Sequence, residues 1–151
     1  MSKAISIFTG VCCDWRKNLL ILAFNRSKSI NFGCGNLKLK NALNLDCDKK
    51  VNPDFIWDLE KLPLPFKDKE FYTAFCFDIL EHLSHPKEFI KEVERVSKRS
   101  VWFCLNFDRA KENWFADVTH KTYLNWKIWK ELFSSYFVFR FTPYDLVAVK
   151  F

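Results

Sequence analysis

Glycine is scarce in this chain: the 151 residues include only three, and Gly33 and Gly35 stand one residue apart. A dinucleotide-binding fingerprint that began at Gly33 would need a third glycine at the position of Lys38. A glycine-rich phosphate loop followed by Lys-Ser or Lys-Thr is also absent from the sequence. A pyrophosphate site is therefore not expected, although the glycine pair still allows a tight turn where a ligand can approach the backbone.

Long apolar runs are missing as well. The longest, at residues 19–24, is far too short to span a bilayer. Near the N-terminus, Asp14, Arg16 and Lys17 interrupt the apolar residues, so no signal peptide is expected. We predict a cytoplasmic protein that does not enter a membrane.

Metal-binding cysteine patterns are absent too, because none of the six cysteines forms a Cys-x-x-Cys pair. Cys34, Cys76 and Cys104 lie inside or beside apolar runs, which indicates buried free thiols in a reducing compartment. A zinc site that combines cysteines with His82 and His85 is the alternative, but the spacing fits no common zinc site. No metal site is therefore predicted.

Apolar and aromatic side chains are abundant, at 49% and 18% of the residues. This content is enough for a core in one domain and argues against disorder. We predict a single domain over residues 1–151, with an N-terminal cap segment at 1–28 and a cofactor-binding core at 29–151. The aromatic surplus is also compatible with a homodimer.

The net charge of +6 permits anionic ligands or nucleic acid without requiring either. In the densest basic stretch, residues 87–99, lysines and arginines alternate with Glu88, Glu92 and Glu94. That alternation is typical of a solvated helix face. Nucleic-acid binding is still an alternative function, but only the positive net charge supports it.

Short apolar runs alternate with helical or loop segments from residue 29 onward. Phe89, Val93 and Val96 form an apolar stripe on one predicted helix, and Pro86 suits its first turn. The alternation predicts a parallel or mixed sheet with helices on its faces. Helices are expected at 15–25, 86–97 and 123–133. Strands are expected at 29–32, 42–45, 55–57, 72–77, 101–105, 137–141 and 146–149.

Only residues 36–41 separate the glycine turn from the next strand. A parallel crossover normally needs a dozen or more residues and a helix, whereas six extended residues reach at most about 20 Å. We therefore expect the first crossover helix to be absent or reduced to one turn. The segment 15–25 is expected to cover that face of the sheet instead.

Polar residues follow the first four predicted strands. Gly33-Cys34-Gly35-Asn36 follows the first strand, Asp46 and Asp48 follow the second, Asp58 the third and Asp78 the fourth. In an open sheet, ligands bind beyond the carboxyl ends of the strands where the strand order reverses, so these residues are expected to share one crevice. A glycine turn followed by a carboxylate that can accept both ribose hydroxyls suits an adenosine without a phosphate.

Motifs at these strand ends resemble those of class I S-adenosylmethionine-dependent methyltransferases. They are Ile30-Asn31-Phe32-Gly33-Cys34-Gly35-Asn36, Leu43-Asn44-Leu45-Asp46-Cys47-Asp48, Trp57-Asp58-Leu59 with Leu62-Pro63-Leu64-Pro65-Phe66, and Phe77-Asp78-Ile79-Leu80-Glu81-His82-Leu83. The chain looks most like a short subgroup with a Gly-Cys-Gly motif and a Leu-Glu-His segment. The resemblance covers about residues 29–105. It implies a Rossmann-like class I methyltransferase fold, with a mostly parallel sheet, helices on both faces and a reduced first crossover.

The resemblance also implies S-adenosyl-L-methionine as the cofactor. Asp46 would hold the ribose hydroxyls, Asp58 would face the adenine edge, and Asp78 would lie near the reactive sulfur. His82 would stand near the substrate. The cofactor-binding residues implied in this way are Gly33, Cys34, Gly35, Asn36, Asp46, Cys47, Asp58, Leu59, Phe77 and Asp78.

Methyl transfer requires few catalytic groups from the protein, because the sulfonium of S-adenosylmethionine already carries an activated methyl group. Catalysis needs mainly an aligned acceptor and, where required, a base. His82 and His120 are the candidate bases, since an unperturbed histidine titrates near neutral pH. A packing or hydrogen-bonding role is the competing interpretation for each.

The acceptor is left open between a small molecule, a protein side chain and RNA. Enzymes that methylate amino groups of DNA bases carry an Asp/Asn-Pro-Pro-aromatic turn where this chain has Phe77-Asp78-Ile79-Leu80. Those that methylate cytosine carbon use a Pro-Cys nucleophile, whereas Phe75 precedes Cys76 here. Direct methylation of DNA bases is therefore not expected. The main alternative function is a non-catalytic S-adenosylmethionine-binding regulatory or partner subunit.

Overall fold

The computed structural model describes residues 14–26 and 28–151, so Cys12, Cys13 and half of the predicted cap segment lie outside the described residues. The strands are β1 (Ser29–Phe32), β2 (Ala42–Asp46), β3 (Phe55–Ile56), β4 (Phe71–Phe77), β5 (Ser97–Leu105), β6 (Phe137–Phe139) and β7 (Asp145–Lys150). The helices are α1 (Trp15–Phe24), α2 (Pro86–Val96), α3 (Lys111–Ala116) and α4 (Trp126–Leu132), with short 3-10 helices η1 (Lys49–Val51) and η2 (Leu80–His82).

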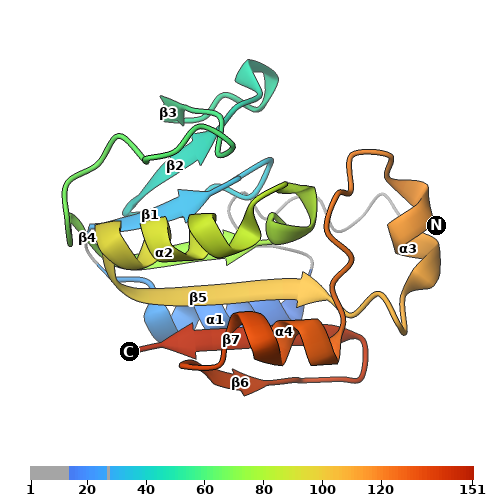
Figure 1. Ribbon diagram of the computed structural model, residues 1–151. Helices are drawn as coiled ribbons and strands as arrows, with labels where there is room; N and C mark the ends of the chain where they lie inside the picture. Colours follow the sequence, from blue (N-terminus) through green and yellow to red (C-terminus); the bar gives the residue numbers. More distant parts are fainter. Residues whose placement is uncertain (1–13, 27) are drawn as a thin grey trace.

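The seven strands form one sheet in the order β3-β2-β1-β4-β5-β7-β6 (Figure 1). Neighbours are parallel from β3 to β5, whereas β7 is antiparallel to both β5 and β6. From β1 the chain continues to β2 and β3 on one side of β1, and then crosses to β4 and β5 on its other side. The reversal of strand order therefore lies between β1 and β4, where ligands bind in open sheets of this kind.

Helices cover both faces of the sheet, with α2 and α4 on one face and α1 on the other (Figure 1). On α2, the predicted stripe is buried, and Phe89 and Val93 are at most 1% exposed. On the opposite face, Leu20 of α1 packs in a cluster with Leu39 and Phe75. This arrangement confirms the predicted fold class and the expected place of the N-terminal helix.

The first crossover contains no helix, as the length of residues 36–41 predicted. Two buried asparagines bind its backbone in place of helical hydrogen bonds. Asn31 Nδ2 donates to the Leu37 carbonyl at 2.7 Å, and Asn44 Oδ1 accepts the Leu39 N–H at 2.8 Å. The two side chains also bond to each other at 3.2 Å. Because buried backbone groups need partners, these asparagines allow a short, non-helical connection to be stable.

Two predicted boundaries are wrong because side chains bind the backbone there. Helix α4 begins at Trp126 rather than at 123, since the Asn125 side chain caps it by accepting the Ile128 N–H at 2.9 Å. Strand β6 ends before residue 141, since the Phe141 N–H donates to Asp145 Oδ1 at 2.7 Å instead of to a neighbouring strand. Both deviations come from local polar contacts.

Strand β5 begins at Ser97, four residues before the predicted start. The start of this strand was not predicted because residues 98–100 are polar. In the sheet, however, Ser97 pairs with Phe71 and Arg99 with Thr73. Helix α3 was not predicted, and none of its residues is buried, so it carries no apolar stripe to reveal it. None of the described helices has the length and apolar character required to cross a membrane.

Candidate functional site

The glycine turn follows β1 and has a backbone that favours glycine. Gly33 has a φ of +60° and Gly35 a φ of +48°, in the left-handed region. A Cβ on Gly33 would lie 2.3 Å from Ile79 Cγ2, so the close approach of these two segments also requires glycine. Gly33 borders the cavity described below. The turn therefore brings backbone, without a side chain, to the cavity wall.

Two carboxylates stand at the ends of the next strands. Asp46 ends β2, and its Oδ2 accepts the Gly35 N–H at 2.8 Å while its Oδ1 accepts the Asp48 N–H at 2.9 Å. Asp58 follows β3, and its Oδ1 accepts the Glu60 N–H at 3.0 Å. Both carboxylates border the same cavity. These backbone contacts fix the direction of each carboxylate and leave lone pairs for a ligand.

A cavity of about 380 Å³ lies beyond the carboxyl ends of β1, β2 and β4. Its size is within the range of small-molecule and cofactor sites. The predicted site residues that border it are Gly33, Asp46, Cys47, Asp58, Leu59, Asp78 and His82. Four strand ends separated in sequence are thus brought together, as expected.

The other predicted site residues stand behind or beside the cavity wall. Cys34 and Phe77 are buried, at 4% and 6% exposure, and do not border the cavity. Asn36 is exposed, and Gly35 contacts Asp46 through its backbone rather than bordering the cavity. His120 comes near the site through His82, with 4.8 Å between the ring centroids.

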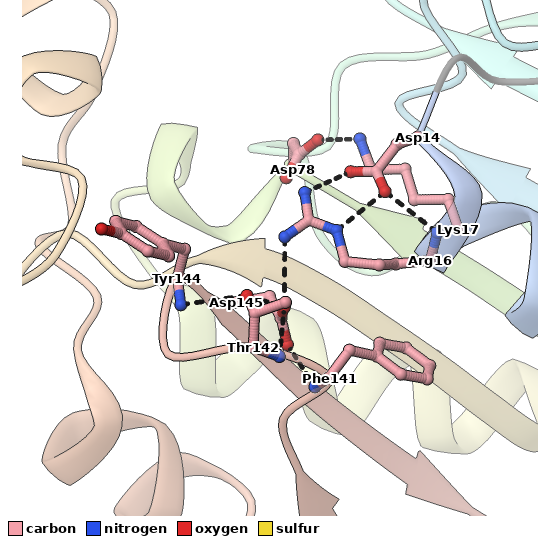
Figure 2. A network of polar contacts seen from close by, with 8 residues as sticks. All are labelled: Asp14, Arg16, Lys17, Asp78, Phe141, Thr142, Tyr144 and Asp145. Carbon is pink, nitrogen blue, oxygen red and sulfur yellow. Dashed lines mark hydrogen bonds and ion pairs between the residues drawn. The ribbon is translucent and has the colours of Figure 1, made fainter.

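Asp78 follows β4 with a φ of +49°, an uncommon conformation for a residue with a side chain. Its N–H donates to the Phe103 carbonyl at 2.8 Å, and its carboxylate forms an ion pair with Lys17 of α1 (Figure 2). The strained backbone turns this carboxylate toward the cavity, which it borders. Strain of this kind occurs at functional sites.

Helix α1 is held next to this site by a polar network (Figure 2). Arg16 donates to both carboxylate oxygens of Asp14 and, at 3.1 Å, to Asp145 at the start of β7. Asp145 is fully buried and also accepts the N–H groups of Phe141 and Thr142. A buried carboxylate needs such partners. The network therefore links α1 to the strand ends beside Asp78.

Several cavity residues were not assigned a site role from the sequence. Glu60 and Lys121 form an ion pair at 2.6 Å across the cavity edge, and Glu60 Oε1 also accepts the Ser84 N–H at 2.9 Å. Lys121 lies 61 positions after Glu60 in the sequence, so no local pattern links them. The unassigned residues that border the cavity are Trp57, Glu60, Ile79, Leu83 and Lys121.

Two histidines and a buried glutamate gather at one end of the cavity. His82 is half-buried, and burial together with the neighbouring His120 lowers its pKa. Glu81 is 3% exposed, and burial together with the Asp78 carboxylate raises its pKa to about 8. A neutral imidazole is the form that accepts a proton or binds a metal ion.

Residues 37–105 match a protein-family model described as a methyltransferase domain. The match runs from the first crossover to the end of β5 and includes Asp46, Asp58 and Asp78. The chain has the class I S-adenosylmethionine-dependent methyltransferase fold. No curated protein sequence matches it.

Solved structures with this fold cover most of the chain. A SAM-dependent methyltransferase from Archaeoglobus fulgidus has a TM-score of 0.73 at 13% identity, over 89% of this chain and 90% of that one. The structure of a Haloferax volcanii complex that contains the Trm112 methyltransferase activator gives a TM-score of 0.67 at 13% identity, over 89% of this chain and 87% of that one. A protein from Bacillus halodurans gives a TM-score of 0.64 at 16% identity, over 85% of this chain and 71% of that one. At such identities the likeness establishes the fold.

The family match and the shared fold confirm the resemblance and the fold class predicted from the sequence. The match to the methyltransferase-domain model over residues 37–105 also supports the predicted enzyme class, a methyltransferase, and with it the predicted cofactor, S-adenosyl-L-methionine. The roles of individual residues are not tested by these comparisons and stay predictions.

Proposed function

We propose that the chain binds S-adenosyl-L-methionine in the cavity beyond β1, β2 and β4 and transfers its methyl group to an acceptor beside His82. One observation carries this proposal: a single cavity is bordered by Gly33, Asp46, Asp58 and Asp78, from four strand ends. The cavity lies where the strand order reverses, which is the usual ligand site of such sheets.

Asp46 would bind the ribose. Its carboxylate is already oriented by the N–H groups of Gly35 and Asp48, so little ordering is required when the ligand arrives. Each oxygen keeps a lone pair for a ribose hydroxyl. Asp58, with the Leu59 backbone, would face the adenine edge at the β3 end of the same cavity.

The methionyl part would extend from the ribose toward Gly33 and Asp78. Gly33 offers close contact with its backbone, and the Asp78 oxygen that is not paired with Lys17, Oδ1, suits the cofactor's ammonium group. Cys34 and Phe77 are buried and would contribute by packing, whereas the exposed Asn36 would reach the amino-acid end of the cofactor.

Methyl transfer then requires an acceptor in line with the sulfonium. The acceptor's lone pair attacks the methyl carbon, the carbon–sulfur bond breaks, and sulfur keeps the electron pair. Holding the two reactants in this geometry supplies much of the catalysis. His82 borders the cavity and His120 contacts His82, so both are proposed to act at the acceptor end.

The acceptor is proposed to be a small molecule, a protein side chain or RNA. The non-catalytic alternative predicts cofactor binding without turnover. A cytoplasmic location, one domain over residues 1–151 and a homodimer also stay predictions.

Calorimetric titration of the full chain with S-adenosylmethionine and S-adenosylhomocysteine tests the proposal, with Asp46→Asn as the variant and Asp48→Asn as its control. Hydrogen bonds to a charged group contribute about 1.5–3 kcal/mol, so Asp46→Asn should weaken binding roughly 10- to 150-fold. Asp48 lies on the same loop but does not border the cavity, so Asp48→Asn should change the affinity less than about twofold. Equal losses in both variants, or no binding by the wild type, would contradict the proposal.

A further inference from the structure

Three side chains of metal-binding type converge at the His82 end of the cavity. Glu81, His82 and His120 each offer a ligand atom, and these atoms lie within 4.8 Å of one another. Metal bonds to nitrogen and oxygen of about 2.0–2.2 Å place two ligands of one ion roughly 3–4 Å apart. The three atoms are thus close to the separation that a single ion imposes.

The backbone holds the two segments that carry these ligands together. Glu81 and His82 belong to η2, which two residues separate from the end of β4, and His120 lies between α3 and α4. The Glu81 carbonyl accepts the N–H groups of Lys121 and Thr122, at 2.7 and 3.0 Å. These contacts position the His120 segment against η2 without any ligand.

Each imidazole is oriented so that one nitrogen stays available. His120 Nδ1 lies 3.0 Å from the Trp114 carbonyl oxygen, which can only accept, so Nδ1 carries the hydrogen and Nε2 keeps its lone pair. His82 Nδ1 lies 2.9 Å from Thr119 Oγ1, and that hydroxyl already donates to Asp117 at 2.6 Å. His82 Nδ1 is therefore the donor, and its Nε2 also keeps a lone pair. Histidine ligands in metal sites are typically oriented in this way.

Glu81 supplies an independent sign of a missing ligand. The residue is 3% exposed, yet its Oε2 has no hydrogen-bond partner among the residues that the structure describes. A buried carboxylate oxygen without a partner is costly. A cation at this position would supply the missing partner.

A second group, Asp78 with Glu81 and Cys104, is a weaker candidate. Asp78 Oδ2 is already paired with Lys17, although Asp78 Oδ1 has no hydrogen-bond partner among the described residues. Burial raises the pKa of the Cys104 thiol well above its ordinary value, which disfavours the thiolate that a metal needs. The imidazole pair has neither obstacle.

We propose that Glu81, His82 and His120 bind one divalent first-row transition-metal ion at the acceptor end of the cavity. Two imidazoles and one carboxylate suit Mn²⁺ or Zn²⁺ better than Mg²⁺, which prefers oxygen ligands. Three protein ligands leave coordination positions open, and His82 borders the cavity, so the open positions are accessible from the place of the acceptor. This site departs from the sequence-based expectation of no metal.

In a role that rests on the proposed function, the ion would select an acceptor with a hydroxyl group. It binds the hydroxyl oxygen and lowers its pKa, so that the proton leaves to solvent. The oxygen attacks the methyl carbon, and the carbon–sulfur bond breaks with its electron pair kept by sulfur. The two histidines are then ligands rather than free bases.

The test is a titration of untagged, chelator-treated full chain with Mn²⁺, followed by electron paramagnetic resonance, and with Zn²⁺ by calorimetry. One ion per chain is expected. Glu81→Gln and His120→Asn remove a ligand each and should weaken binding at least about tenfold, and the exposed Thr119→Val should weaken it roughly 10- to 100-fold by releasing His82. His85 is exposed and outside the cluster, so His85→Asn should bind as the wild type does.

The proposal is overturned if neither ion binds saturably, or if all variants bind alike, which would indicate an adventitious ion. Circular dichroism of each variant shows whether it is folded, and Thr119→Val keeps the test valid if a ligand variant fails to fold. Titration of chelator-treated protein with S-adenosylmethionine tests the cofactor site separately. Cofactor binding without metal binding would reject the metal site alone, and the reverse result would reject the cofactor proposal alone.

Discussion

Replacing Gly33 by alanine should destabilise the protein strongly, whereas Gly35→Ala should have a smaller effect. Both glycines have positive φ, at +60° and +48°, so either alanine would be strained. A Cβ on Gly33 would also lie 2.3 Å from Ile79 Cγ2, while a Cβ on Gly35 would meet nothing within 4 Å. Comparing the two variants therefore separates the cost of backbone strain, which both have, from the cost of steric overlap, which only Gly33→Ala has.

The magnitudes follow from these two costs. Left-handed backbone costs an alanine roughly 1–2 kcal/mol, and overpacking adds about 1–3 kcal/mol at Gly33 only. Gly33→Ala should thus lose about 2–5 kcal/mol and Gly35→Ala about 1–2 kcal/mol. In a domain of this size, each kcal/mol lowers the melting temperature by about 2–4 °C. The expected decreases are about 4–20 °C and about 2–8 °C.

Thermal and urea unfolding measure the difference, and a double-mutant cycle identifies its cause. Ile79→Ala removes the Cγ2 atom that the new Cβ would meet. In that background, Gly33→Ala should cost about as much as Gly35→Ala does in the wild type. Equal costs for the two glycines in the wild type, or a Gly33→Ala cost that Ile79→Ala leaves unchanged, would refute the steric argument.

Two further predictions concern the loop beside α2 and the cavity thiol. Arg95 donates to the carbonyls of Leu64 and Phe66, at 2.9 and 2.8 Å, and lysine has no planar fork to reach both. Arg95→Lys should therefore lose about 1–3 kcal/mol in urea unfolding, and a loss below about 0.5 kcal/mol would contradict this. Cys47 is exposed and borders the cavity, so S-adenosylhomocysteine should slow its alkylation. Burial raises the pKa of the Cys76 thiol, so Cys76 should react only after unfolding. Peptide mass spectrometry measures the alkylation of both cysteines. Equal rates of Cys47 alkylation with and without the ligand would contradict the proposed position of the cofactor.

The sequence predicted those parts of the fold in which one local pattern is sufficient. The strand at residues 29–32 was expected from the apolar Ile30 and Phe32, and the stripe that includes Phe89 and Val93 defines α2. The shortness of the segment at residues 36–41 was sufficient to predict that the first crossover has no helix. The stabilising contacts of Asn31 and Asn44 were not predicted, because they join buried side chains to a loop backbone.

The parts that the sequence did not predict depend on contacts between distant segments or on capping. The polar start of β5 has no apolar run and is a strand because it pairs with β4. The Glu60–Lys121 ion pair and the contact of His82 with His120 join residues that are far apart in the chain. The strand-end residues Asp46 and Asp58 could be found because parallel strands bring their carboxyl ends together. His120 does not follow a parallel strand, so this rule does not predict its position beside His82.

A crystal structure of the protein with S-adenosylhomocysteine tests the central claim most directly. The account predicts both ribose hydroxyls within hydrogen-bond distance of the Asp46 carboxylate, the adenine edge at Asp58, and the sulfur on the side of His82. A ligand bound elsewhere, or a ribose that does not contact Asp46, would contradict the account.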